Sequence, residues 1–348
     1  MNQLKNSWLT VNRQCNLRCR WCYAGSTEFK RTSDMPVPLA KKLIDLIAQT
    51  GIKNVALTGG EPTCYEGLGE LIHYVSSSGL NAVLITNGVA LSDRDSWESL
   101  RSQGLTSVNL SLKGCSEEDY RKNTGIEAYG QTLQAISNMA ASNINHVVSM
   151  VLSSDNIDTY LHAVKDAVDW GGKEFHFSFE HDFSVLDGNE NPYDIRKVFQ
   201  LIDGFQNSYE NLLEITKGHF QLHQSLPICI WDKKLIKKLS ENNQIITSCQ
   251  LLERSGLVFD TDGSLIPCNL MHQVPIGKYG EDFQDIESFM AFWNAPETKE
   301  MYQGICNYPG KECLHCAEKH HCGGGCVSNW YHYSYAELMD AFQAERRT

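Results

Sequence analysis

A short β-rich run leads directly into three closely spaced cysteines in the segment Ser7-Trp8-Leu9-Thr10-Val11-Asn12-Arg13-Gln14-Cys15-Asn16-Leu17-Arg18-Cys19-Arg20-Trp21-Cys22-Tyr23. Aromatic and β-branched residues in its first part predict a strand over residues 7–12. The three thiols that follow need a metal, because thiolates packed so closely repel one another unless a metal offsets their charge. The segment therefore predicts a metal-bearing loop at the carboxyl end of the first strand.

Strands and helices alternate along the chain after this segment. Short apolar runs predict strands at residues 55–57, 82–85, 107–112, 146–152 and 174–179. Amphipathic stretches between them predict helices, including 36–49, 129–141 and 159–170. Such alternation produces a parallel sheet with helices packed outside it. With the first strand this makes six β-then-α units. We therefore expect an α/β fold, a partial (β/α)6 barrel rather than a closed eightfold one.

The composition changes near residue 215. A helical stretch to about Glu214 ends the alternation, and from Thr216 onward cysteines crowd together while Gly and Pro interrupt short segments. We therefore expect two domains, a barrel over residues 1–215 and a cysteine-rich domain over residues 216–348.

The overall composition narrows the range of partners. The chain has 30 Lys and Arg against 42 Asp and Glu, a net charge of −12, which opposes binding to nucleic acid or to an anionic membrane surface. It shows neither a secretion signal nor an apolar run approaching about 18 residues. Thirteen cysteines in a chain without a secretion signal favour metal or redox chemistry over disulfides. We expect a cytoplasmic protein that binds neither nucleic acid nor membrane.

The first cysteine group resembles the signature of the radical S-adenosylmethionine (SAM) superfamily, C-x3-C-x2-C followed by an aromatic residue, here Cys15, Cys19, Cys22 and Tyr23. The resemblance implies a [4Fe-4S] cluster on three cysteines, whose fourth iron stays open to the amino and carboxylate groups of SAM. It also places Tyr23 near the adenine of SAM. A structural zinc site is the alternative, but zinc needs four protein ligands and no fourth Cys or His lies close by.

A second motif, Gly59-Gly60-Glu61-Pro62, directly follows the second predicted strand. It resembles the motif with which the superfamily holds the amino group of the SAM methionine. The same resemblance places three further residues near the ribose or the carboxylate of SAM: Asn87, Ser111 and Lys113. These positions lie at the carboxyl ends of predicted strands, where the chemistry of parallel βα folds is found.

The resemblance also implies a reaction. One electron cleaves SAM to methionine and a 5′-deoxyadenosyl radical, and the radical abstracts a hydrogen from an unactivated C–H bond. The cofactors supply this reactivity, while the protein positions the reactants and excludes water. A reductase such as flavodoxin or ferredoxin would supply the electron.

The cysteines after residue 215 resemble a SPASM domain, the auxiliary-cluster extension of many radical SAM maturases of peptides and proteins. The first part of that pattern is matched by Cys249-x13-Gly263-x4-Cys268. Its second part, C-x2-C-x5-C-x3-C, is matched by Cys313, Cys316, Cys322 and Cys326. The resemblance implies an auxiliary cluster I on Cys249, Cys268 and Cys326. It implies an auxiliary cluster II on Cys313, Cys316 and Cys322. The final cysteine of the pattern is absent, so each cluster lacks one ligand.

Several residues are candidates for the missing ligands. Cys306 is preferred, because it lies seven residues before Cys313 across a turn that folds the chain back. Cys229 is weaker, because its apolar neighbours favour burial as a small hydrophobe. Two non-cysteine alternatives are His332 and Asp340. The alternative to the clusters is a zinc ribbon on the four late cysteines, since tetrahedral thiolate sites also use C-x2-C pairs.

The motifs together predict an enzyme that abstracts hydrogen from a residue of a short ribosomally made peptide and forms a cross-link or another oxidised product. Such enzymes often bind a peptide leader through an N-terminal winged-helix module, which only 14 residues before Cys15 do not provide. A separate leader-binding protein would then present the peptide, or the SPASM region and the barrel mouth would bind it directly.

Three alternatives remain open. A small-molecule dehydrogenase and a sulfatase maturase use the same scaffold. The maturase is disfavoured, because Asn269 stands where those enzymes have a catalytic Asp after the cysteine, and an amide is no base at neutral pH. A non-catalytic iron–sulfur or zinc protein is the third, and the two intact motifs argue against it.

Overall fold

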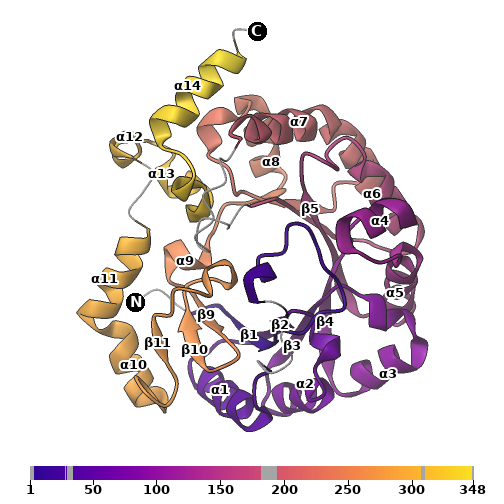
Figure 1. Cartoon of the computed structure of the whole chain (residues 1–348), viewed down its shortest axis with the longest axis vertical. Coiled ribbons are helices and arrows are strands. Elements are labelled where there is room, and N and C mark those ends of the chain that lie inside the picture. Colours follow the sequence, from indigo (N-terminus) through magenta and orange to yellow (C-terminus); the bar gives the residue numbers. More distant parts are fainter. Residues whose placement is uncertain (1–3, 28, 30–33, 182–193, 307–309, 347–348) are drawn as a thin grey trace.

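The computed structural model describes residues 4–27, 29, 34–181, 194–306 and 310–346. Within these residues an 11-stranded sheet runs in the order β11-β10-β9-β1-β2-β3-β4-β5-β6-β7-β8. The strands that pair in parallel along the chain are β1 (Asn6–Asn12), β2 (Asn54–Gly59), β3 (Asn81–Thr86), β4 (Leu105–Ser111), β5 (Asn145–Leu152), β6 (Phe175–Phe179), β7 (Phe220–His223) and β8 (Ile245–Ile246). They curl into an incomplete ring with helices outside it (Figure 1).

Three later strands extend the sheet beyond β1. β9 (Gly256–Phe259) pairs in parallel with β1, and β10 (Ser264–Ile266) and β11 (Gly277–Lys278) follow as antiparallel strands. Among the described residues β8 and β11 end the sheet, so the ring stays open between them. The C-terminal segments, orange to yellow in Figure 1, lie along that side of the ring.

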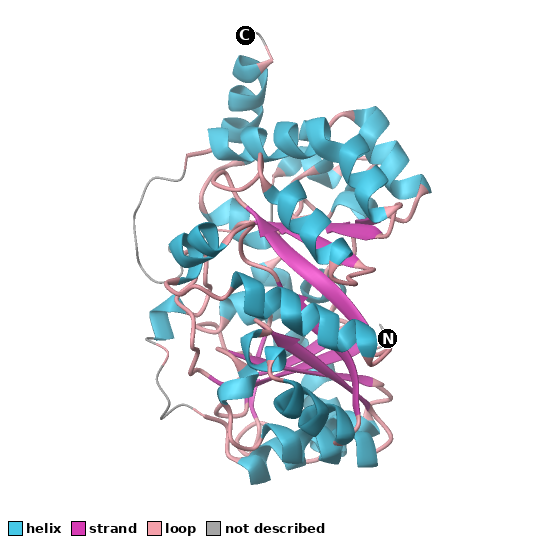
Figure 2. Cartoon of the chain, turned by 90° about the vertical axis from the view of Figure 1, so that its right-hand side faces the viewer, coloured by secondary structure: helices cyan, strands magenta, loops and turns pink. Residues whose placement is uncertain are grey.

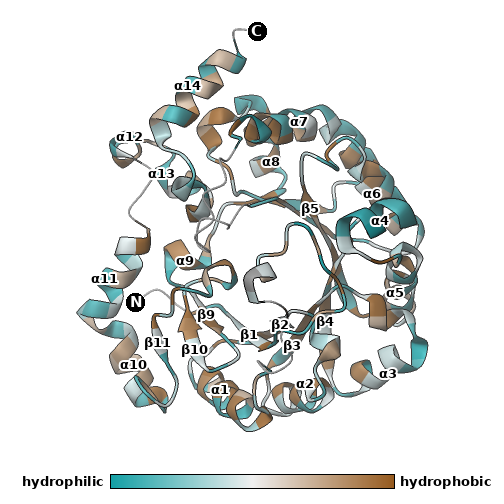
Figure 3. Cartoon of the chain, viewed as in Figure 1, coloured by the Kyte–Doolittle hydropathy of each residue, from teal (hydrophilic) through white to brown (hydrophobic). Residues whose placement is uncertain are grey.

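Helices cover the outside of the ring. Those that connect the parallel strands are α1 (Val37–Gln49), α2 (Leu68–Ser77), α3 (Arg94–Ser102), α4 (Glu117–Thr124), α5 (Tyr129–Ala141), α6 (Tyr160–Asp169), α7 (Arg196–Thr216) and α8 (Lys233–Glu241). In α1 the side chains of Leu43, Ile44 and Ile47 are fully buried at helical spacing. Figure 3 shows both hydrophobic and hydrophilic residues along each of the outer helices.

The predicted partial barrel is confirmed. All six predicted strands are present, and each predicted helix lies where the apolar periodicity placed it. β7 and β8 add two parallel strands, which four and two residues are too short to reveal by pattern. Strands β7 to β11 all follow residue 215 and join the same sheet. The division into two domains at residue 215 stays a prediction.

The remaining helices belong to the cysteine-rich part of the chain. They are α9 (Gln250–Glu253), α10 (Ile286–Asn294), α11 (Pro296–Ile305), α12 (Lys311–Leu314), α13 (Lys319–Cys322) and α14 (Tyr335–Glu345). α14 packs on α7 through Phe342 and Phe199, whose ring centroids are 5.9 Å apart. Seen from the side, α14 projects at one end of the molecule (Figure 2). Among the described helices, none is both long and apolar enough to cross a membrane.

Candidate active site and a cysteine-lined cavity

The three cysteines of the first group lie on the loop that follows β1, inside the ring of strands (Figure 1). α4 holds the backbone of this loop. The Arg18 N–H donates to the Thr124 carbonyl at 2.8 Å, and the Arg20 N–H donates to the Asn123 carbonyl at 3.1 Å. Both carbonyls belong to the last turn of α4, where a helix leaves carbonyls without internal partners. The loop therefore completes the helix, and the helix fixes the loop.

The thiols of Cys15, Cys19 and Cys22 lie close enough to influence one another. Burial raises the pKa of Cys15 to about 12, and the neighbouring Glu61, Cys19 and Cys22 add to the rise. Burial also raises the pKa of Cys22, and Cys19 again adds to it. The Leu17 N–H donates to Cys15 Sγ at 3.3 Å, a contact that favours a thiolate. The three cysteines thus lie near one another on one loop, and their role as cluster ligands stays a prediction.

Gly59 and Gly60 allow the end of β2 to touch this loop. A Cβ on Gly59 would meet the Asn12 carbonyl at 2.6 Å, and a Cβ on Gly60 would meet the Arg13 carbonyl at 2.5 Å. The Gly60 N–H donates to the Asn12 carbonyl at 2.9 Å and closes the contact. Side chains at either position would push away the loop that carries Cys15.

Glu61 is buried, and its carboxylate is fully occupied. Oε1 accepts from the Thr63 N–H (3.0 Å) and hydroxyl (2.7 Å) and from the Thr86 hydroxyl (2.7 Å). Oε2 accepts from the Asn87 N–H at 2.7 Å. Pro62 begins the short turn η3 (Pro62–Cys64), which Glu61 caps. The carboxylate therefore joins the ends of β2 and β3, while the role of this motif toward the SAM amino group stays a prediction.

Asn87 and Ser111 lie at the same carboxyl edge of the sheet. Asn87 Nδ2 donates to Asn16 Oδ1 at 2.7 Å, and Asn87 Oδ1 accepts from the Val89 N–H at 3.0 Å. Asn87 thus positions the residue that follows Cys15. Ser111 is the last residue of β4. The predicted contacts of both residues with SAM stay predictions.

Lys113 brings a positive charge to the cysteine loop. It lies half-buried, two residues after β4. Burial opposes its charge, but the thiols of the triad, with Cys19 foremost, and Tyr120 outweigh that effect and raise the pKa of Lys113. A fixed ammonium here offsets part of the negative charge that three thiolates bring.

Tyr23 lies between the two cysteine groups. Burial raises its pKa, and the neighbouring Cys22 and Cys268 both add to the rise. Cys268 follows β10, so Tyr23 stands where the loop inside the ring faces the cysteine-rich part. Its predicted place near the adenine of SAM stays a prediction.

A buried ion pair joins the same two regions, and sequence reasoning missed it. The Arg13 guanidinium, just after β1, contacts both carboxylate oxygens of Asp260, just after β9. The two side chains are only 6% and 14% exposed. The partners are 247 residues apart in sequence, so no local pattern could reveal the pair.

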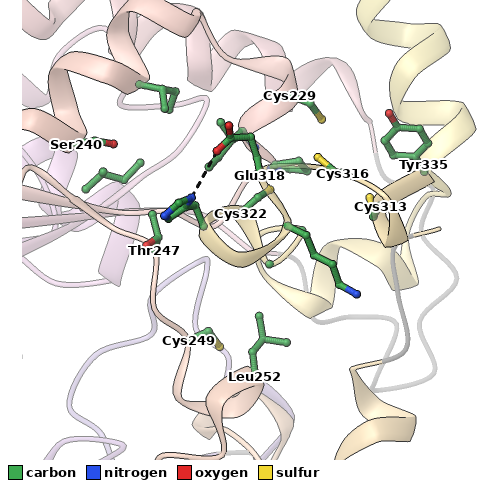
Figure 4. A pocket seen from close by; sticks show the side chains of 18 of the residues that line it. Cys229, Ser240, Thr247, Cys249, Leu252, Cys313, Cys316, Glu318, Cys322 and Tyr335 are labelled. Atoms are coloured by element: carbon green, nitrogen blue, oxygen red, sulfur yellow. Dashed lines mark hydrogen bonds and ion pairs between the residues drawn. The ribbon is translucent and has the colours of Figure 1, made fainter. Parts of the chain in front are cut away.

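Six cysteines line one cavity of about 1490 Å³ in the cysteine-rich part of the chain: Cys229, Cys249, Cys306, Cys313, Cys316 and Cys322. Figure 4 shows that they do not form one group. The thiols of Cys229, Cys313, Cys316 and Cys322 gather in one part of the cavity, and Cys249 stands apart from them beside Leu252.

The predicted cluster I cysteines lie together. Burial raises the pKa of Cys268 to about 12, and Cys326 and Cys249 add to the rise. Burial raises the pKa of Cys306 to about 11, and the neighbouring Cys249 adds to the rise. Cys306 therefore lies near this group. Cys306 ends α11, which Arg254 holds in place by stacking on Tyr302 at 4.8 Å from the ring centroid.

The predicted cluster II cysteines also lie together, and Cys229 is among them. Burial raises the pKa of Cys229 to about 11, and Cys322, Cys313 and Cys316 add to the rise, in that order. Burial likewise raises the pKa of Cys313, with Cys322 and Cys316 adding to it.

The expectation that Cys229 is buried is wrong. Cys229 is exposed to the cavity, whereas the next residue, Ile230, is only 1% exposed. Both lie on the 3₁₀ turn η6 (Ile228–Ile230), where three residues complete a turn and successive side chains point about 120° apart. The isoleucine therefore enters the core and leaves the thiol facing outward.

The glycines at 323–325 do permit a close backbone approach. All three adopt positive φ, and a Cβ on Gly325 would meet the Ser225 carbonyl at 2.6 Å. The approach in this structure is thus to the connection between β7 and α8. Of the nearby histidines, His315 and His321 are exposed.

A single metal ion finds no tight ligand group here. Among the described residues, no set of three or more His, Cys, Asp or Glu side chains converges on one ion position. The ligands of a cubane cluster need not converge on one position, because each of its four irons binds its own ligand. Measuring iron and zinc by elemental analysis would distinguish an iron–sulfur cluster II from the alternative zinc ribbon.

The comparison with protein families decides the identity of the barrel. The model of the radical SAM superfamily matches residues 9–181, which include the cysteine triad and the strands β2 to β6. The chain belongs to the radical SAM superfamily. This radical SAM chain is 31% identical over 147 residues to Fe-coproporphyrin III synthase of Methanosarcina barkeri, covering 42% of the chain and only 37% of that relative. It is 26% identical over 282 residues to GTP 3′,8-cyclase of Chlorobaculum tepidum, covering 76% and 78%.

Two solved structures share this radical SAM fold over almost the whole chain. One is anSMEcpe with bound AdoMet, 18% identical with a TM-score of 0.70, covering 98% of each chain. The other is Streptococcus suis SuiB bound to the precursor peptide SuiA, 17% identical with a TM-score of 0.69, covering 94% of this chain and 73% of SuiB. At these identities the likeness establishes the fold.

Membership of the radical SAM superfamily implies a [4Fe-4S] cluster and SAM, and the residues present fit them. Three neighbouring thiols would hold three irons of a cubane, and the fourth iron would be left to SAM. A backbone N–H already donates to one of the sulfurs, and Lys113 offsets their charge.

Proposed function

We propose that this chain is a SPASM-type radical SAM enzyme that abstracts a hydrogen from a residue of a ribosomally made peptide and forms a cross-link or another oxidised product. The observation that carries the proposal is the position of the cysteine-rich part. Its residues from Cys249 onward contact both the β1 side and the β7 side of the open barrel, near the loop that holds the triad.

The contacts with the two edges are specific. β9 pairs with β1 at one edge, and the Arg13–Asp260 ion pair lies at the end of these strands. At the other edge, the Ser225 carbonyl after β7 accepts from the Cys326 N–H at 2.8 Å and from Asn329 Nδ2 at 2.7 Å. Auxiliary clusters in this position would take up the second electron when a substrate radical is oxidised.

The related structures support a peptide substrate. SuiB is described as bound to a precursor peptide, and anSMEcpe as bound to the Cp18Cys peptide. Both share the fold with this chain over at least 94% of its length. We extend the peptide from those proteins to this one, presented by a separate leader-binding protein or bound directly by the SPASM region and the barrel mouth.

The bound cofactors would supply the chemistry, a one-electron cleavage of SAM that yields a 5′-deoxyadenosyl radical. The residues of the chain provide its geometry. The two glycines and the buried Glu61 fix the cysteine loop against β2 and β3. Lys113 holds a positive charge beside the thiolates. Leu17, between Cys15 and Cys19, is only 1% exposed and anchors the loop in the hydrophobic core.

The cofactors and partners follow from this proposal. Cluster I would be held by Cys249, Cys268, Cys326 and Cys306, and cluster II by Cys313, Cys316 and Cys322. Flavodoxin or ferredoxin would reduce the triad cluster. A cytoplasmic location fits, because thiolate ligands need a reducing compartment.

The decisive experiment first looks for a short open reading frame beside the gene and uses the peptide that it encodes. The peptide is co-expressed with the enzyme under anaerobic conditions and examined by mass spectrometry. We expect a mass loss of two hydrogens, localised to one linked pair of residues by fragmentation. Co-expression with Cys15→Ala should return the unmodified peptide. An unmodified peptide with the active enzyme, together with SAM cleavage that only a small molecule stimulates, would contradict the proposal.

A small-molecule substrate is the second candidate. It is favoured by the sequence relative named GTP 3′,8-cyclase, which matches 76% of this chain. Anaerobic assays of 5′-deoxyadenosine release with GTP, with a porphyrin and with the peptide would rank the classes. A sulfatase maturase needs a base other than Asn269, because an amide side chain does not accept a proton at neutral pH.

A further inference from the structure

The implied cluster II has three cysteine ligands and a missing fourth. Its three cysteines belong to residues 313–322, and the family pattern would take the fourth from after Cys326, but residues 327–348 contain no cysteine. An iron without a protein ligand would be open to solvent, because α12 buries none of its residues and Cys316 is exposed. A cysteine from a distant part of the described chain could close this position.

Cys229 is placed to supply it. It lies 84 residues before Cys313 in sequence but lines the same part of the cavity, and Figure 4 shows its thiol among those of Cys313, Cys316 and Cys322. It is exposed on the cavity side of η6. Among the described cysteines that Figure 4 labels, only these four lie in that part of the cavity.

Backbone and side-chain hydrogen bonds hold η6 against the cluster II segment. The Ile228 N–H, one residue before Cys229, donates to Cys322 Sγ at 3.3 Å. Gln224 Nε2 donates to the Cys322 carbonyl at 3.0 Å. N–H donors to sulfur are the contacts that ligating thiolates receive. The segment bearing Cys229 is therefore fixed to a cluster II ligand by bonds that do not involve the Cys229 thiol.

We propose that Cys229 is the fourth thiolate of cluster II, with Cys306 assigned to cluster I as in the proposed function. The proposal rests on the auxiliary clusters of the proposed function and replaces the missing terminal cysteine of the family pattern with one from the connection between β7 and α8. Both clusters then have four cysteine ligands, the usual arrangement for a [4Fe-4S] centre. A closed cluster II has no iron free to bind substrate, so its role is to carry electrons.

The test measures iron and spectra, so it depends on neither the peptide nor SAM cleavage. Reconstituted protein with three cubanes holds about 12 Fe per chain, from four irons in each. We expect Cys229→Ala to lose up to about 4 of these irons to a chelator at least about tenfold faster than the unchanged protein, and to lose or shift one auxiliary EPR signal. Cys229→Ser should shift that signal with less loss of iron, because the serine oxygen can replace the sulfur as a ligand.

Double variants identify the cluster. Cys229→Ala combined with Cys322→Ala should lose no more iron than Cys322→Ala alone, because both residues bind one cluster. Cys229→Ala combined with Cys306→Ala should lose the iron of two clusters. Cys115→Ala, a half-buried thiol outside both groups, is the matched control.

Three results would overturn the assignment. They are unchanged iron loss and EPR spectra in Cys229→Ala, additive losses with Cys322→Ala, or the same signal affected by Cys229→Ala and Cys306→Ala. One zinc per chain in place of the cluster II iron would instead overturn the auxiliary clusters themselves. Failure to modify a peptide, with the iron results as expected, would affect only the proposed function.

Discussion

Glu61 shows how one buried side chain sets the geometry of the site. Its two oxygens receive four hydrogen bonds, from two backbone N–H groups and two hydroxyls, and it is 1% exposed. A carboxylate can accept all four, because it carries about four lone-pair sites and no donor. An amide of the same size places a donor against one of these partners. The site therefore favours a carboxylate over an amide of the same shape.

Glu61→Gln should therefore destabilise the protein although the volume hardly changes. The amide NH2 would face a donor, most directly the Asn87 N–H, and a buried unsatisfied donor costs about 1–3 kcal/mol. Urea denaturation of both proteins gives the change in the free energy of unfolding. Glu300→Gln, an exposed carboxylate on α11, is the control and should change it by less than about 0.5 kcal/mol. Equal stabilities would show that the Glu61 charge is dispensable.

The triad should be separable from the other cysteines. Replacing Cys15, Cys19 and Cys22 with Ala should lower the iron content by about 4 Fe per chain, one cubane, and leave the auxiliary iron in place. In the presence of SAM and dithionite, release of 5′-deoxyadenosine should stop, and liquid chromatography measures it. Cys115→Ala should keep both properties. Continued SAM cleavage by the triple variant would refute the assignment of the triad.

At the scale of elements, the barrel could be predicted and some of its supports could not. The strands β1 to β6 and their helices follow from apolar runs and helical periodicity, as in α5, whose bounds 129–141 match the prediction. α4 was missed, because Glu117–Thr124 is almost entirely polar and buries only Tyr120, Asn123 and Thr124. Its carbonyls nevertheless hold the cysteine loop. Hydrophobic patterning reveals elements that build the core, and α4 supports the site mainly by hydrogen bonds.

The contact between β1 and β9 depends on a buried charge pair. Asp260→Asn would leave the Arg13 guanidinium, 6% exposed, without a counter-charge. Breaking a buried pair in this way typically costs about 3–5 kcal/mol. We expect a loss of about 3 kcal/mol in the free energy of unfolding and lower occupancy of cluster I, since Tyr23 neighbours both this ion pair and Cys268.

The control for the ion pair is a surface pair. Arg101 and Glu98 are 44% and 40% exposed, so Arg101→Ala should change the free energy of unfolding by less than about 1 kcal/mol. Similar losses in Asp260→Asn and Arg101→Ala would show that burial does not strengthen the Arg13 pair.

Histidines at the ends of β6 and β7 should make stability depend on pH. Burial lowers the pKa of His181 to about 4, and His223 and His332 lower it further against a hydrogen bond to Asn329. The unfolded chain, with a pKa near 6.5, then binds more protons than the folded one between about pH 4 and 6.5. Stability should rise with pH across this window, by up to about 3 kcal/mol from this group, and be lost as the pH falls.

Urea denaturation at several pH values would measure this dependence. His181→Asn should flatten the slope between pH 4.5 and 6.5 relative to the unchanged protein. His162→Asn, at an exposed position on α6, should leave the slope as it is. An equal slope in the unchanged protein and in His181→Asn would mean that His181 titrates normally in the folded state.

At the scale of the molecule, the sequence could sort the cysteines into groups, but it could not predict which barrel segments contact the C-terminal cysteines. The spacing of the motifs predicted the triad and most of the auxiliary ligands proposed here. The position of Cys229 depends on η6, on the contact of Gly325 with Ser225, and on a pairing of segments about 90 residues apart, for which a single sequence has no periodic signal. Long-range contacts between short irregular segments are therefore where prediction from sequence stopped.

Residues 311–326 have little hydrophobic core of their own. α12 buries no residue, and Leu314 is 61% exposed, whereas α5 alone buries six residues. The bonds from Ile228 and Gln224 tie this segment to the barrel at one cysteine. Metal bound by Cys313, Cys316 and Cys322 would supply the remaining stabilisation. The free energy of metal binding contributes directly to folding where the apolar core is small.

Removing the metal should therefore loosen this segment and spare the barrel. Hydrogen exchange of the protein before and after anaerobic chelation measures both parts in one experiment. We expect exchange in residues 311–326 to speed up at least about tenfold, and exchange in β2 to β5 to stay within about twofold, because those strands are held by the main core. The same exchange measured in Cys229→Ala should approach that of the chelated protein in residues 311–326 alone. Equal protection with and without metal would mean that hydrogen bonds to the barrel hold the segment, and that its cysteines add reactivity without adding structure.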